Sequence, residues 1–521
     1  MAAPNGVRLV RLLCSSTFGC VLLFLSLLFA TLCSVAQSLP EELPWEGRGI
    51  SLQTLRIQES FATTNLVARE WLQRHSYLKS SLYSLQRGNN REIESFLYPR
   101  PISSHGVISE GAWRDSTNTY FGATHLAFHD YGERRWTKLV TPQLFYPYLV
   151  LDSTEAQPRN LMGMVSGGVS RRMESSTFAL LAEYRGQRLQ ATGGSEHKGT
   201  LHNLRLREGL SIPLGRYWFS QWGEFAYRWQ QYRAASEQPI RFFRHIGFGL
   251  WDLGRTTVVQ QIDLVATSGR VSCGLQLAPH GAGVLASLSA THRWGTTSDI
   301  HQRSVASFVL QELHLLLGYD YSAGQQRLQA AVDASWQNRT GVEQFYDSVG
   351  RRGNKKYQLL FSEPTYKARY RTYGIQLVYS APLAAWTYGA RLWAGYTSQE
   401  SEYNRPSSHL HLTRWKTETT LHLAWQHARH LCALQAAWIF FTRATQQRDL
   451  SRYTREPLRS EFLLPEIERR LPPRHYLMAT VEYAYTLPNG LTLSVAPEVG
   501  YLRSLGGGAL WRGGIRLGVA L

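Results

Sequence analysis

An alternation of apolar and polar residues with a period of two runs through this chain, and it is clearest in residues 511–521. Such a period places one set of side chains on each face of an extended strand. The apolar set is Trp511, Ile515, Leu517, Val519 and Leu521, and the other face carries Arg512, Gly514, Arg516, Gly518 and Ala520. Apolar groups on one side, with arginines and small residues on the other, are typical of a strand between lipid and a wet interior.

The same alternation recurs in residues 204–212, 327–337, 477–487 and 491–501. In the first of these, Leu204, Leu206, Leu210 and Ile212 oppose Arg205, Arg207, Gly209 and Ser211. Pro488-Asn489-Gly490 separates the last two segments and favours a tight turn. Because about 9–11 tilted residues cross the hydrocarbon layer, each segment is long enough to span a membrane.

No stretch after residue 36 approaches the ~18 consecutive apolar residues of a spanning helix. A chain that crosses lipid with strands must close them into a barrel, because open edges leave backbone groups unpaired. The sequence therefore predicts an all-β fold, a transmembrane antiparallel β-barrel over residues 76–521 with about 18 strands (range 16–20). We count about 17 strands from residue 159 onward and one ending near Phe128, and leave open a further hairpin from Tyr77–Gln86.

The expected connections sort into two kinds, as they do in bacterial outer-membrane barrels. Those on the periplasmic side are short, near 488–490, 428–430, 381–383, 322–324, 280–282, 253–254, 214–215 and 173–175. Those outside are mostly long, near 446–473, 400–407, 340–365, 296–302, 234–240, 191–199 and 129–158, with short exceptions near 268–269 and 504–506. A soluble β-sandwich has no reason to sort its loops in this way.

The N-terminus predicts export. Arg8 and Arg11 precede an apolar stretch, and Ser34-Val35-Ala36 offers small residues for cleavage between Ala36 and Gln37. We interpret residues 1–36 as a signal peptide, with an uncleaved anchor helix as the alternative. Residues 37–75 are expected to be a periplasmic segment, either a short plug helix or a loose tail.

The formal charge of the whole chain is +18. Export argues against nucleic acid as the partner, so outer-membrane lipid, lipopolysaccharide phosphate or anions in the lumen are the expected partners, with scattered solvated charge as the alternative. Only Cys273 and Cys432 follow the signal peptide, so disulfides are not expected to organise the fold.

Two charged groups are candidate sites. Arg512 and Arg516 should lie near Glu498 on the neighbouring strand and Glu482 beyond it, and Arg205 and Arg207 also point inward. Such a lumen charge network either creates a field that orients permeating solutes or braces the barrel. A basic loop cluster, Arg351, Arg352, Lys355 and Lys356, is expected to contact lipopolysaccharide phosphate or to be a solvated loop tip.

Catalytic motifs are absent from the sequence. There is no Gly-x-Ser-x-Gly and no His-Glu-x-x-His, so we expect no catalytic residues, no metal site and no cofactor. His409 and His411 share one strand face, whereas His422 and His427 lie on opposite faces.

Residues 118–153 contain Gly122-Ala-Thr, Trp136 and Leu144-Phe-Tyr146-Pro147-Tyr148-Leu-Val-Leu-Asp152-Ser153, and Gly341-Val-Glu343-Gln-Phe-Tyr346 follows later. With these motifs, residues 60–521 resemble an uncharacterised family of outer-membrane barrels from Bacteroidetes-type bacteria. That resemblance implies TonB-dependent receptors or surface lipoproteins as partners. More remotely, Thr64-Asn65-Leu66-Val67-Ala68 is similar to the fatty-acid transporter class of barrels.

The sequence thus predicts a non-enzymatic outer-membrane barrel for porin-like passage or uptake of a small solute. Two alternatives stay open. One is a non-conducting partner of a TonB-dependent receptor or secretion system. The other is a lipid-modifying barrel enzyme, which would need a hydroxyl or carboxylate beside a histidine at the lipid-facing rim.

Overall fold

The computed structural model describes residues 76–88, 101–136, 148–193, 196–246, 250–251, 257–299, 304–349, 356–404, 407–449, 467–505 and 508–520. Within these residues, no helix is long and apolar enough to pass through a bilayer. The predicted signal peptide, the segment 37–75 and the motif Thr64–Ala68 lie outside the described residues.

Within the described ranges, eighteen long strands form the wall, and three short ones (β4, Arg134–Trp136; β9, Leu250–Trp251; β18, Thr445–Asp449) pair at its rim. The wall strands are β1 (Tyr77–Arg87), β2 (Ser103–Arg114), β3 (Asn118–Asp130), β5 (Tyr148–Arg172), β6 (Thr177–Gly193), β7 (Glu196–Leu214), β8 (Tyr217–Ile246), β10 (Thr257–Pro279), β11 (Gly283–Asp299), β12 (Ser304–Ala323), β13 (Gln326–Val349), β14 (Lys356–Leu383), β15 (Trp386–Asn404), β16 (Ser407–His427), β17 (His430–Phe441), β19 (Arg474–Thr486), β20 (Thr492–Ser504) and β21 (Ala509–Ala520).

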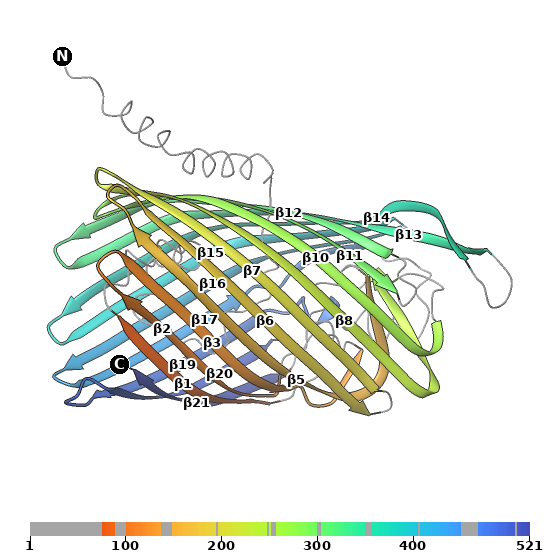
Figure 1. Cartoon of the computed structure of the whole chain (residues 1–521), viewed down its shortest axis with the longest axis horizontal. Coiled ribbons are helices and arrows are strands. Elements are labelled where there is room, and N and C mark those ends of the chain that lie inside the picture. Colours follow the sequence, from red (N-terminus) through yellow and green to blue (C-terminus); the bar gives the residue numbers. More distant parts are fainter. Residues whose placement is uncertain are drawn as a thin grey trace, which may run out of the picture.

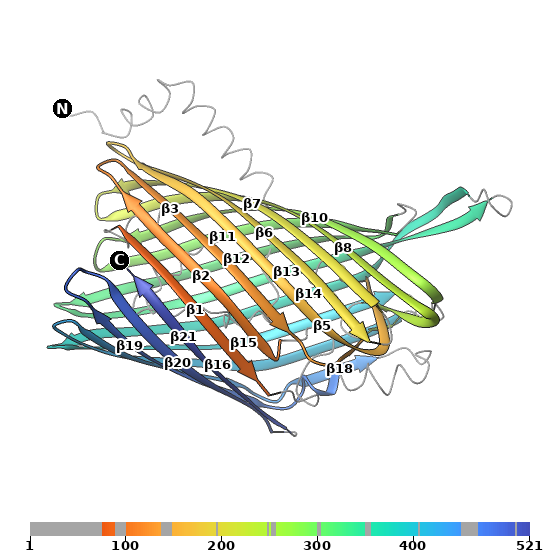
Figure 2. The same cartoon turned by 60° about the horizontal axis from the view of Figure 1, so that its bottom comes forward.

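Each wall strand pairs antiparallel with the next along the chain, and β21 returns to β1. The closing register places Lys79 opposite Ala520 and Arg87 opposite Arg512. Figure 1 shows the resulting cylinder with tilted strands, and Figure 2 shows β1 beside β21. The predicted fold class, a closed antiparallel barrel of about 18 strands, is confirmed.

One end of the barrel has only tight connections. The turns 115–117, 173–176, 215–216, 280–282, 324–325, 384–385, 428–429 and 487–491 lie there, together with the C-terminal end of β21. By the usual orientation of bacterial barrels this end is periplasmic. At the other end several strands extend well past the wall, and β13 and β14 project farthest in the view (Figure 1).

The outer surface is apolar. On β21, Trp511 and Leu517 are 61% and 51% exposed, as the terminal alternation predicts. Aromatic pairs bound the apolar band: Trp386 and Trp425 near the periplasmic turns and Tyr396 and Trp415 ten residues along their strands, with ring centroids 6.4 Å and 5.6 Å apart. Rings at both edges of an apolar band mark the two interfaces of a membrane.

One residue interrupts the apolar row. Glu208 lies on the lipid-facing side of β7 between Leu206 and Leu210, opposite Gly223 of β8. Leu206 is 44% exposed, which shows that this row points outward. The buried side chains, by contrast, point inward, and the bulkiest fully buried ones are Tyr232, Tyr366 and Tyr403.

Three expected connections were placed wrongly. β8 continues through 234–240, and β10 continues through 268–269, so the real connection between them is at 247–256. The expected turn at 253–254 falls in that outer connection instead of a periplasmic one. These errors add two strands to the expected count. The structure has two further strands, β1 and β2 of the N-terminal hairpin, which that count did not include. The expected and observed numbers of strands therefore agree, although the strands are assigned differently.

The reason for the error at 268–269 is a packing contact. The Trp294 ring covers Gly269, and a Cβ added there would lie 2.3 Å from the ring. Glycine in a strand interior often marks such a close approach and not a turn. The error at 234–240 has a different origin. Residues 234–240 of β8 pair with β10 at the point where the register shifts, between Val259 and Gln261.

Candidate functional site

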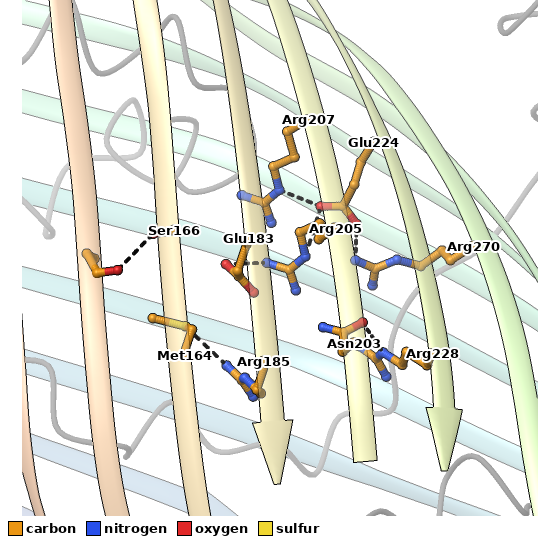
Figure 3. Close-up of polar contacts among 11 residues, drawn as sticks. Met164, Ser166, Glu183, Arg185, Asn203, Arg205, Arg207, Glu224, Arg228 and Arg270 are labelled. Carbon is orange, nitrogen blue, oxygen red and sulfur yellow. Dashed lines mark hydrogen bonds and ion pairs between the residues drawn. The ribbon is translucent and has the colours of Figure 1, made fainter.

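Five charged side chains gather on the inner wall of four consecutive strands. Glu183 (β6), Arg205 and Arg207 (β7), Glu224 (β8) and Arg270 (β10) occupy inward positions, which alternate with lipid-facing ones. The register pairs Glu183 with Arg205 and Arg207 with Glu224, so opposite charges are lateral neighbours. We call this set the Glu224 cluster (Figure 3).

Glu224 is the centre of the cluster, and its side chain is only 3% exposed. Arg207 Nε donates to Glu224 Oε2 at 2.5 Å, and Arg205 Nε lies 3.6 Å from the same oxygen. Arg270 donates to Glu224 Oε1. One buried carboxylate therefore holds three guanidinium groups, an arrangement in which the carboxylate offsets the repulsion between its neighbours.

The second carboxylate of the cluster serves one of the same arginines. Arg205 Nη1 lies 3.4 Å from Glu183 Oε2. Three cations thus share two carboxylates, which leaves the cluster with an excess of positive charge. Glu312, buried on the inner face of β12, is another acid within electrostatic range of Arg270, and also of Arg293 and Arg339.

Two more arginines lie beside the cluster on the same wall. Arg185 of β6 contacts Met164 Sδ at 3.9 Å, and thioether sulfur is a weak acceptor. Arg228 of β8 donates to Asn203 Oδ1 at 3.2 Å. Figure 3 shows both guanidinium groups on the same stretch of wall as Arg205. The wall is therefore dominated by arginine.

The predicted lumen residues fall into two groups. Arg205 and Arg207 belong to the Glu224 cluster, whereas the other four lie on β19–β21, separated from β7 by β6, β5, β3, β2 and β1. There, Arg512 Nη2 lies 2.8 Å from Glu498 Oε1. Arg516 is opposite Ala496, and Glu482 acts electrostatically on His422.

Other predicted positions cannot be placed. Arg351, Arg352 and Lys355 lie outside the described residues, as do Ala36 and Gln37. Lys356 begins β14, but its side chain is outside the described set. The role of the basic loop cluster stays a prediction.

His409 and His411 of β16 lie on the outer face, beyond the Tyr396–Trp415 pair. His409, Glu400 and Glu402 have ligand atoms within 4.8 Å of one another. Carboxylate and imidazole donors suit a divalent metal, but Arg369 Nη1 pairs with Glu400 at 3.4 Å. Close by, Ser398 Oγ lies 3.1 Å from His411 Nε2.

Sequence reasoning missed five members of this wall: Glu183, Arg185, Glu224, Arg228 and Arg270. The signal was present, because each one lies at an inward position, one residue out of step with the apolar, lipid-facing residues of its strand. What the alternation does not give is the neighbour across the strand pair. That depends on register, which the sequence leaves undetermined wherever turns are misplaced.

A closed barrel with an apolar band between aromatic edges and a charged interior defines an outer-membrane β-barrel protein. The chain belongs to a family of unknown function, DUF6850, which matches residues 99–521. No curated protein matches the sequence.

Three solved structures are similar to this chain at low sequence identity. A variant of the ferric enterobactin receptor PfeA from Pseudomonas aeruginosa is 9% identical, with 86% of this chain and 81% of that chain covered and a TM-score of 0.37. The siderophore receptor PiuA from Acinetobacter baumannii is 6% identical, with 86% of this chain and 82% of that chain covered and a TM-score of 0.41. The copper transporter OprC is 9% identical, with 82% of this chain and 62% of that chain covered and a TM-score of 0.40. Similarity this low carries no argument about function.

The expected family resemblance is confirmed at the level of an uncharacterised family. The remote similarity to fatty-acid transporters is not confirmed, since the neighbours above are receptors and a copper transporter. None of these three is named as an enzyme.

Proposed function

We propose that this barrel passes or takes up a small solute across the outer membrane, in a porin-like manner. The observation that carries the proposal is the charged inner wall within a closed cylinder of eighteen strands. Barrels of 16–18 strands enclose an aqueous channel when nothing fills them. Ionised groups such as those of the Glu224 cluster favour contact with water over apolar filling.

The two charged groups on the inner wall are positioned to act on a passing solute. The Glu224 cluster lies on one part of the wall, and the Glu498–Arg512 pair lies on another. Fixed charges on the wall of a pore create a field that orients and selects what passes. Glu110 on β2 points inward and is nevertheless exposed, so part of the wall borders open space.

Planar-bilayer recording of the purified full-length protein tests this function. Stepwise conductance in KCl is the expected result, and insertions without conductance would refute passage of ions. If the protein co-purifies with a TonB-dependent receptor or a surface lipoprotein and does not conduct, the role of a non-conducting partner is favoured instead.

A second candidate function, a lipid-modifying enzyme, has one observation in its favour. Ser398 and His411 are in hydrogen-bond contact just beyond the outer aromatic girdle, the level at which lipid ester groups lie. In acyl transfer, Ser398 Oγ would attack an ester carbonyl while His411 Nε2 accepts its proton and returns it to the leaving alcohol. Water would then hydrolyse the acyl-serine.

Comparison of lipid mass spectra from cells with the wild type and with Ser398→Ala tests the enzyme. The variant should restore acylated lipid that the wild type removes. Identical spectra, together with spectra unchanged by deletion of the protein, would exclude this activity.

A further inference from the structure

The inner wall around the Glu224 cluster has more cations than the nearby acids neutralise. Glu224 and Glu183 are both engaged, and they are shared among Arg205, Arg207 and Arg270. The Glu224 side chain is only 3% exposed, so its carboxylate is not accessible to a further cation. Because these arginines already outnumber the two acids, an additional positive charge on this wall increases the excess.

Arg185 is that additional charge. Its guanidinium makes the Met164 sulfur contact, and its Nε is a buried donor without a hydrogen-bond partner among the described residues. The Nε atoms of Arg205 and Arg270 are also buried and make no hydrogen bond to a described residue, although Arg205 Nε lies 3.6 Å from Glu224 Oε2. Buried N–H donors that make no hydrogen bond are costly unless an acceptor arrives.

We propose that this wall is a binding site for the oxyanion group of a solute, a carboxylate or a phosphate, with Arg185 as its main anchor. The site rests on the proposed function, because it names the class of solute that the barrel passes. Guanidinium groups present planar pairs of donors that match two oxygens of one anion. A solute cation meets an excess of positive charge here.

Ion selectivity of the reconstituted channel is the first test. In a KCl gradient the wild type should prefer chloride to potassium, since arginine-lined pores favour anions. Arg185→Gln should lower the chloride-to-potassium permeability ratio at least about twofold, because one unit charge at several ångströms alters the local potential by about RT in water.

The matched control is Arg188→Gln, which removes the same charge from the outer face of β6, three residues along the strand. It should leave selectivity unchanged. A conducting channel that prefers potassium, or a ratio that Arg185→Gln and Arg188→Gln lower equally, would overturn the oxyanion site and leave the proposed passage intact.

A binding measurement decides the site even if the barrel does not conduct. Inorganic phosphate at constant ionic strength should raise the unfolding temperature of the wild type above that in chloride, since a ligand of the folded state stabilises it. Arg185→Gln should lose this shift, and Arg188→Gln should keep it. If phosphate does not change the unfolding temperature of the wild type, the oxyanion site is refuted. Lack of conductance alone refutes only the proposed passage of a solute.

Discussion

Replacing Glu208 by leucine should make the barrel more stable in a bilayer. Glu208 lies near the middle of the outward row of β7 that runs from Leu204 to Leu214. Its neighbours across the strand pairs are Leu180, which is 47% exposed, and Gly223. No described side chain forms a hydrogen bond or ion pair with it. A carboxyl group in this position faces acyl chains.

The magnitude follows from this placement. At the centre of a bilayer a lipid-facing Arg or Lys costs about 2–4 kcal/mol, and an acidic side chain costs less. The Gly223 backbone gives the carboxyl room, since a Cβ added there would lie 2.9 Å from Glu208 Oε1. We therefore assign the carboxyl group a cost of about 1 kcal/mol, to which leucine adds about 1 kcal/mol of favourable transfer. The expected gain is about 2 kcal/mol, or roughly 30-fold in the folded-to-unfolded ratio.

Urea unfolding in lipid vesicles, followed by tryptophan fluorescence, measures this free energy of unfolding. Glu208→Gln should recover part of the gain, and the matched control Leu206→Glu, two residues along the same row, should destabilise the barrel by a comparable amount. If Glu208→Leu unfolds at the same or a lower urea concentration than the wild type, the assignment of this face to lipid is wrong.

Three further predictions concern the wall, the turns and the outer face. Glu224→Gln should lower the free energy of unfolding by about 3 kcal/mol, because it leaves three guanidinium groups without their carboxylate; unfolding in urea that matches the wild type would contradict this. In the β2–β3 turn, backbone N–H groups of Asn118 and Thr117 hold the pKa of Asp115 below its usual 3.8, so the stabilisation from these bonds is present above that value and lost as pH falls below it. Amide exchange at Thr117 and Asn118, corrected for the intrinsic rate, should therefore be slow at pH 5 and accelerate only in stronger acid, and a rate that rises already near neutral pH would count against it. A spin label on Cys273, which faces outward on β10, should be more accessible to oxygen than to a water-soluble nickel chelate, and the reverse order would place it in water.

The sequence determines the class of fold because the period-two alternation is local. Apolar rows such as Leu204–Ile212 and Trp511–Val519 state which face of each strand meets lipid, and the structure has both rows outward. Closure then follows from physical necessity, since a strand edge in lipid leaves its backbone groups unpaired. The number of strands follows only approximately, because each misplaced turn adds or removes one.

Turns were misplaced where a local signal had a tertiary cause. Ser268-Gly269 has the composition of a turn, but the glycine accommodates Trp294 of the neighbouring strand. In the same way, outer loops expected to be long are partly strand, since β13 and β14 continue to pair beyond the membrane. The sequence of one strand does not show how far the neighbouring strand continues to pair with it.

The candidate site was likewise predictable from the sequence only in part. The sequence alone determined that Arg205 and Arg207 point inward, because facing depends only on residue parity along one strand. Only the tertiary structure decided that Glu224 and Arg270 meet them. The contact of Arg512 with Glu498 was expected from the sequence, because the two residues lie on strands joined by one short connection. Lateral neighbours are set by the register between strands, and register is a property of the closed barrel as a whole.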